Sequence, residues 1–153
     1  MKEMSSYRLG LDVGRVLKDH GYVGGEVPGA LPYLKLLIKQ NIFEEIYLVS
    51  QCLWVSRYSV RRWLIIHEIQ TILIDPSHII FCNRDSWKAN IAKEHRFTHF
   101  VDDHLTVLTP MTSVPHRYLF GGARPPVLPD GITHVNDWEH LFLYFKLLRN
   151  PPQ

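Results

Sequence analysis

The chain has 153 residues, of which 46% are hydrophobic and 21% charged, with a formal net charge of +2. This length and composition predict a single domain spanning residues 1–153 that buries its own core. Basic residues are scattered apart from short clusters such as Arg61-Arg62, so charge gives no indication of nucleic acid binding. Because no apolar run approaches about 18 residues and the N-terminus lacks a signal-peptide stretch, we expect a cytoplasmic protein that does not cross a membrane.

Apolar strands and helical patterns alternate along the first half of the chain. The predicted elements are a strand at 7–12, a Gly/Pro-rich turn at 21–29, a helix at 29–40, a strand at 46–50 and a helix at 56–72. The pattern over 56–72 places Val60, Leu64, Ile65 and Ile69 on one helical face. This half therefore has the order of strand and crossover helix that parallel sheets use.

The second half continues the alternation. The predicted elements are a strand at 79–82, a helix through Ile91 and Ala92, a strand at 99–101, a short helix near 104–109, a strand at 117–120 and a Gly/Pro-rich loop at 121–131. Asp85 or Ser86 is the expected cap of the helix after the third strand. The last segment, with Val135, Trp138 and Phe145, has helical spacing. The fold class that follows is α/β: a doubly wound, mainly parallel, Rossmann-like sheet with helices on both faces.

Polar residues follow the predicted strands. Asp12 ends the first strand, Ser50 the second and Asp102-Asp103 the fourth, and Lys88 begins the helix between the last two strands. In open α/β sheets ligands bind beyond the carboxyl ends of the strands, so these side chains should meet at one edge. Carboxylates suit Mg²⁺, a hydroxyl and a Lys can hold phosphate oxygens, and an ionised carboxylate can attack phosphorus.

The stretches LDVGRVL, YLVS and HFVDD, with Lys88 between the last two, resemble the four signatures of the haloacid dehalogenase (HAD) superfamily of phosphohydrolases, in order and over roughly residues 7–120. The resemblance implies that Asp12 is a nucleophile forming an aspartyl-phosphate and that Lys88 assists it. It implies phosphate binding by Ser50, Gln51 and Lys88. It also implies a Mg²⁺ cofactor held by Asp12, the backbone carbonyl of Gly14, Asp102 and Asp103.

Gly14 departs from the family pattern, which usually has a second Asp there as general acid and base; Arg15 follows where Gly is common. General acid catalysis contributes about 10²–10⁴-fold in rate. We therefore expect weak activity on alkyl esters unless Asp19, His20 or the substrate supplies the proton. Leaving groups that need no proton, as in acyl phosphates or anhydrides, should be affected least.

Caps in this superfamily are insertions after the first or third strand, and residues 13–28 and 83–87 are too short for one. A capless core leaves the site uncovered, and an uncovered site excludes water poorly. The expected partners are accordingly a phosphorylated substrate, a macromolecular one included, or a protein that covers the site; neither nucleic acid nor membrane is indicated.

Other interpretations of these residues remain open. Ser50 could be a helix cap and Lys88 a solvated first-turn residue, with Lys93 as the substitute phosphate ligand. The chain could be a catalytically inactive HAD-like binding or regulatory protein that keeps the pocket. A receiver-like domain would share the sheet, but its acidic pair normally belongs to the first strand. His95, His99 and His104 match no metal-binding spacing, so structural or surface roles are expected.

Overall fold

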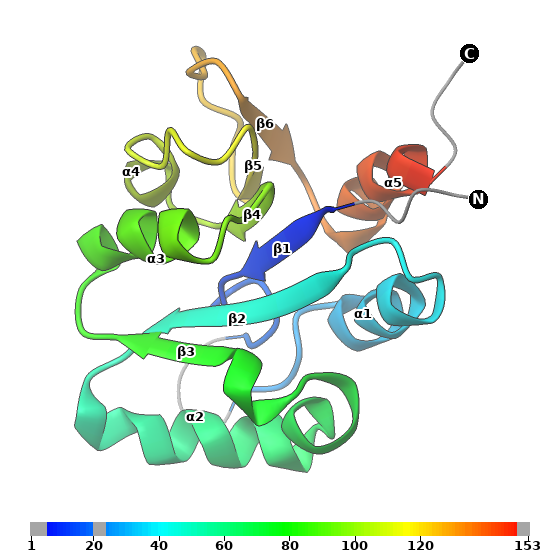
Figure 1. The fold of residues 1–153 in the computed structure, drawn as a ribbon, viewed down its shortest axis with the longest axis vertical. Coiled ribbons are helices and arrows are strands. Elements are labelled where there is room, and N and C mark those ends of the chain that lie inside the picture. The colour runs from blue at the N-terminus through cyan, green and yellow to red at the C-terminus, as the bar shows by residue number, and fades with distance from the viewer. Residues whose placement is uncertain (1–5, 20–23, 150–153) are drawn as a thin grey trace.

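The computed structural model of the chain describes residues 6–19 and 24–149. Its centre is a six-stranded sheet in the order β3-β2-β1-β4-β5-β6, and every neighbouring pair of strands is parallel (Figure 1). The strands are β1 (Arg8–Leu11), β2 (Glu45–Gln51), β3 (Ile79–Cys82), β4 (His99–Asp102), β5 (His116–Phe120) and β6 (Ile132–Val135). The predicted fold class is confirmed.

Helices cover both faces of the sheet. They are α1 (Ala30–Lys39), α2 (Trp54–Ile66), α3 (Lys88–Glu94), α4 (Leu105–Leu108) and α5 (Trp138–Arg149). Apolar side chains of α1, α2 and α5 pack into one hydrophobic cluster, whereas those of α3 and α4 pack into a second. Figure 1 shows α3 and α4 on the opposite side of the sheet from α1 and α5. The protein is thus doubly wound.

Successive side chains of each strand enter different clusters. In β2, Ile46 and Leu48 join the cluster of α1, α2 and α5, while Tyr47 and Val49 join the cluster of α3 and α4. Because helices cover both faces of the sheet, side chains pointing to either face are apolar. The strands therefore appear as continuous apolar runs in the sequence.

β1 and β4 form the point where the strand order reverses. Leu9 of β1 lies opposite His99 of β4, and the backbone N–H of Asp12 donates to the carbonyl of Val101 over 2.9 Å. In doubly wound sheets the crevice beyond this point is the usual ligand site. The register therefore brings the ends of the first and fourth strands, with Asp12 and Asp102, side by side.

The helix predicted over 56–72 is wrong at its C-terminal end. α2 ends at Ile66, Glu68 takes a left-handed conformation with a φ of 59°, and Ile69–Leu73 form a π-helical turn. Ile65 is 46% exposed, so it does not belong to the buried face on which Leu64 lies. The apolar pattern continues past the end of α2 because Ile69, which belongs to the π-helical turn, is also buried.

Two smaller predictions are also wrong. Val135 is the last residue of β6 and pairs with Phe120 of β5, so it precedes the final helix α5 and does not belong to it. Neither Asp85 nor Ser86 caps a helix: both lie in a 3₁₀ turn, Asp85–Trp87, that leads directly into α3 without a side-chain cap.

Two sequence predictions reach beyond the described residues. Part of the predicted turn at 21–29 lies outside them. His20, a candidate proton donor, also lies outside them. Among the helices that the structure describes, none has the length and apolar character needed to cross a membrane.

Candidate active site

A cavity of about 420 Å³ opens beyond the carboxyl ends of β1 and β2 and beside the start of α3. Every predicted site residue except Asp102 lines it, namely Asp12, Gly14, Ser50, Gln51, Lys88 and Asp103. Asp102 lies directly behind the wall and is fully buried. The structure therefore brings the predicted residues together from four separate parts of the chain.

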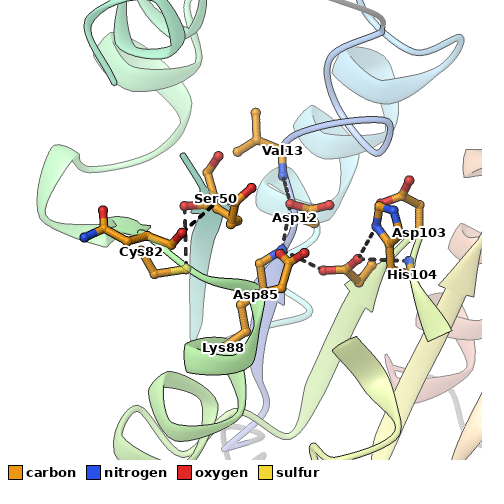
Figure 2. A network of polar contacts seen from close by, with 11 residues as sticks. Asp12, Val13, Ser50, Cys82, Asp85, Lys88, Asp103 and His104 are labelled. Carbon is orange, nitrogen blue, oxygen red and sulfur yellow. Dashed lines mark hydrogen bonds and ion pairs between the residues drawn. The ribbon is translucent and has the colours of Figure 1, made fainter. Parts of the chain in front are cut away.

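Lys88 lies at the centre of a network of carboxylates (Figure 2). Its Nζ is 2.8 Å from Oδ2 of Asp102, 3.1 Å from Oδ1 of Asp12 and 3.5 Å from Oδ1 of Asp85. The 3₁₀ turn before α3 positions it, because that turn ends where the helix begins and directs the first helical residue inward. Lys88 is 2% exposed, whereas Lys93, the alternative, is exposed on α3.

Burial alone would lower the pKa of the Lys88 ammonium, but Asp12 and Asp102 outweigh burial and raise it. The Lys88 side chain is therefore a permanent cation at neutral pH. A buried ammonium is tolerated here because it contacts several carboxylates.

The pKa of Asp12 is raised well above its ordinary value, first by burial and then by the charge of Asp102, while Lys88 opposes both. Burial also raises the pKa of Asp102. Asp103 lines the same cavity, so three carboxyl groups adjoin the wall that holds the Lys88 ammonium. A cation bound among them would favour the ionised forms of Asp12 and Asp102 and so oppose the rise in their pKa.

Asp103 has a buried acceptor atom, Oδ1, that makes no hydrogen bond within the described residues. The Nδ1 of His104 lies 3.0 Å away and forms an ion pair with it only when the imidazole is protonated. An unsatisfied buried carboxylate oxygen beside a cavity is what a hard cation such as Mg²⁺ would bind, so the residues present fit that ion.

Asp102 differs from Asp103 in its contacts. Its Oδ2 accepts from Lys88, and its Oδ1 accepts from the backbone N–H of His104 over 3.0 Å. One ligand atom from each of Asp102, Asp103 and His104 can be chosen so that all three lie within 4.8 Å of one another. Both oxygens of Asp102 are nevertheless engaged by the protein, which leaves Asp103 as the acid of this pair that faces the cavity.

Ser50 and Gln51 end β2 at the opposite wall of the cavity. Ser50 is 6% exposed and pairs in register with Phe81 of β3. The side-chain amide of Gln51 donates to the carbonyl of Asn83 over 3.1 Å, which ties the end of β2 to the residue after β3. The hydroxyl group and the amide therefore stand where β2 meets the cavity.

The segment after Asp12 folds back on itself. The carbonyl of Val13 accepts from the N–H groups of Leu17 and Lys18, each over 3.0 Å, and the N–H of Arg15 donates to the carbonyl of Lys18 over 2.7 Å. Gly14 is exposed, and a Cβ added there would meet no atom within 4 Å. The structure thus has space for a side chain at position 14.

Sequence reasoning missed four residues that line the cavity as charged or titratable groups: Arg15, Lys18, Asp85 and His104. Arg15 has a φ of 61°, the left-handed region in which Gly is at ease, which explains why Gly is common at this position in the resembling family. Lys18 is 9% exposed. The only signal in the sequence was their closeness to Asp12, Lys88 and Asp103, because neither the fold-back nor the turn before α3 is visible in a hydrophobic pattern.

No protein-family model matches the chain, and no curated protein matches its sequence. Solved structures do match its fold. A D,D-heptose 1,7-bisphosphate phosphatase from Burkholderia thailandensis superposes with a TM-score of 0.66 at 14% identity, over 92% of this chain and 98% of that one. A HAD-superfamily hydrolase from Ehrlichia chaffeensis gives 0.59 at 13% identity, over 90% of this chain and 64% of that one. The chain therefore has the fold of the HAD-like hydrolases.

Proposed function

We propose that the protein is a Mg²⁺-dependent HAD-type phosphohydrolase that works through an aspartyl-phosphate at Asp12. The observation that carries this proposal is the contact of the Asp12 carboxylate with the buried Lys88 at the cavity wall, with the unsatisfied oxygen of Asp103 in the same wall. A carboxylate, a fixed cation and a candidate metal ligand are the parts that phosphoryl transfer to Asp requires.

Asp12 is the proposed nucleophile. Its Oδ1 accepts from the backbone N–H of Val13 over 2.9 Å and from Lys88, so the carboxylate is held in one orientation. We assign the attack on phosphorus to Oδ2. The bond between phosphorus and the leaving oxygen then breaks, and water subsequently attacks the aspartyl-phosphate, which yields inorganic phosphate, a proton and the free carboxylate. Lys88 and Ser50 would hold phosphate oxygens during both steps.

The metal would be held by the Asp12 and Asp103 carboxylates and the backbone carbonyl of Gly14. Bound there, Mg²⁺ would neutralise phosphate charge and orient the phosphoryl group. We assign Asp102, predicted from the sequence as a ligand, chiefly to positioning Lys88, because its Oδ2 lies 2.8 Å from the ammonium.

The test measures phosphate release by wild type and by Asp12→Asn, with Asp130→Asn as a matched control at an exposed position outside the cavity. We expect Asp12→Asn to abolish Mg²⁺-dependent turnover and Asp130→Asn to leave it unchanged. Beryllium trifluoride with Mg²⁺ should add to Asp12 in a crystal of the wild type. Turnover that survives in Asp12→Asn would show that the activity belongs to other chemistry or to a contaminant.

A second candidate is a catalytically inactive binding protein that retains the pocket. Gly14 favours it, since the site then lacks the carboxyl group that family members usually use as general acid. This candidate predicts that Mg²⁺ and phosphate bind in isothermal titration calorimetry while no phosphoryl ester or anhydride is turned over. Finding an aspartyl-phosphate at Asp12 during turnover would exclude it.

A further inference from the structure

Two cations border the position where the usual acid is missing. The fold-back after Asp12 places the backbone of Lys18 in a β-bridge with Gly14, and the N–H of Arg15 bonds to the carbonyl of Lys18. Both Arg15 and Lys18 line the same cavity as Asp12 and Lys88. Two basic side chains therefore border position 14, where the usual pattern would supply a carboxyl group.

Lys18 and Lys88 belong to different parts of the cavity. Lys88 enters from the start of α3 and contacts Asp12, Asp102 and Asp85. Lys18 comes from the segment after β1 and is 9% exposed, so its charge acts in a partly water-excluded wall where electrostatic interactions are stronger than in bulk water. Lys88 lies beside the nucleophile, whereas Lys18 and Arg15 come from the fold-back and border a different part of the cavity.

Leaving groups differ in what they need. An alkoxide is too basic to leave without a proton, whereas a carboxylate or phosphate leaves as a stable anion and needs only a compensating positive charge. Asp85 lines the cavity but lies 3.5 Å from the Lys88 ammonium, which it serves as a counter-ion. Asp19 also lines the cavity and is the carboxyl group that could supply a proton to a leaving alkoxide.

We propose that Lys18, assisted by Arg15, stabilises a leaving group that departs as an anion, and that the substrates are phosphoric anhydrides such as acyl phosphates. This inference rests on the proposed function. In the step, an Asp12 oxygen forms a bond to phosphorus, the bond between phosphorus and the acyl oxygen breaks, and the electron pair leaves on the carboxylate. The acyl phosphate of the substrate is converted into the aspartyl-phosphate of the enzyme, which is also an acyl phosphate. This step therefore transfers no proton and needs no further reactant.

The test compares acetyl phosphate with glycerol 3-phosphate as substrates of the full chain with Mg²⁺, and subtracts the background seen with Asp12→Asn. We expect kcat/KM for acetyl phosphate to exceed that for glycerol 3-phosphate by about 10²–10⁴-fold. Lys18→Gln should lower kcat on acetyl phosphate by about 10–10²-fold with little change in KM, and Lys18→Arg should restore most of it. Lys93→Gln, at an exposed position of α3, is the matched control and should have no effect. Circular dichroism checks that each variant is folded.

Gly14→Asp supplies a complementary arm. Because a Cβ added at position 14 would meet no atom within 4 Å, the variant should fold, and the new carboxyl group should raise turnover of glycerol 3-phosphate. The same variant should gain little on acetyl phosphate, whose leaving group needs no proton. A larger gain on acetyl phosphate than on glycerol 3-phosphate would contradict the inference.

Several outcomes overturn the inference while leaving the proposed function intact. These are equal Asp12-dependent turnover of both substrates, an equal loss on both in Lys18→Gln, no loss on acetyl phosphate in that variant, or a glycerol 3-phosphate activity that Asp19→Asn abolishes. If neither substrate is turned over in an Asp12-dependent manner and beryllium trifluoride does not add to Asp12, the proposed function fails and the inference fails with it.

Discussion

Lys88 is the residue whose replacement would most directly test the electrostatics of the cavity. Lys88→Met keeps most of the length and the apolar stem of the side chain but removes the ammonium that lies 2.8 Å from Asp102 and 3.1 Å from Asp12. Both carboxylates would then be buried without their cation. Removing one partner from a buried ion pair typically costs about 3–5 kcal/mol.

The loss of stability should depend on pH in a defined direction. Burial already raises the pKa of Asp12 and Asp102 in the folded protein, and Lys88 counteracts this. Without Lys88 the two pKa values rise further, so folding binds protons more strongly and stability decreases as pH rises above the ordinary carboxyl range. The variant should therefore lose more stability relative to wild type at pH 7 than at pH 4.5.

The assay is urea unfolding followed by circular dichroism at both pH values, with Lys93→Met as control. The control is exposed on α3 and should differ from wild type by less than about 0.5 kcal/mol. Adding Asp102→Asn to Lys88→Met should restore part of the stability, because it removes one of the two uncompensated charges. A Lys88→Met variant as stable as wild type at pH 7 would refute the buried-network reasoning.

Three further predictions concern the fold. Gly10→Ala should lower the free energy of unfolding by about 1–3 kcal/mol in the same urea assay, because the added Cβ would lie 2.5 Å from the Phe100 ring and 2.7 Å from the Phe97 ring; no loss would mean that the rings move aside. Arg15→Gly should relieve the left-handed backbone and raise Tm by about 2–4 °C, equivalent to about 1 kcal/mol, whereas a lower Tm would mean that the Arg15 side chain outweighs the strain. His99 is fully buried, and burial lowers its pKa to about 3, so its contribution to stability is complete above pH 6.5 and is lost as pH falls towards 3, by up to about 1.4 kcal/mol per pH unit. His99→Gln should remove this part of the acid dependence, and an unchanged acid limb would contradict it.

The sequence predicted the sheet well because each central strand is covered on both faces. β1 to β5 appear as apolar runs for that reason, and the polar ends of β1, β2 and β4 mark the cavity. β6 was missed because ITHV, Ile132–Val135, has two half-exposed polar residues between its buried ends. The end of α2 was missed because the left-handed Glu68 interrupts the helix without a Gly or Pro to signal it.

The convergence of the candidate site residues was predicted as far as the ends of the strands determine it. Asp12 directly follows β1 and Asp102 is the last residue of the adjacent strand β4, so their proximity to each other follows from topology alone. The division of contacts between Asp102 and Asp103 could not be predicted, since it depends on which side chain of the pair faces the cavity. The cations of the fold-back, Arg15 and Lys18, were missed because local hydrogen bonds at Val13 place them there.

The position of β1 at the middle of the sheet has a consequence for synthesis of the chain. Leu9 pairs with Ile46 on one side and with His99 on the other, a separation of 90 residues in the second case. At about 5–20 residues per second, roughly 5–18 s of translation separate β1 from its second neighbour. During this interval one edge of the central strand has no partner, as an edge strand does in a finished sheet. Until β4 is synthesised, the edge of β1 that borders the cavity in the folded protein is exposed in the nascent chain. An exposed strand edge can pair with other chains, so we expect the nascent chain to be prone to aggregation during this interval.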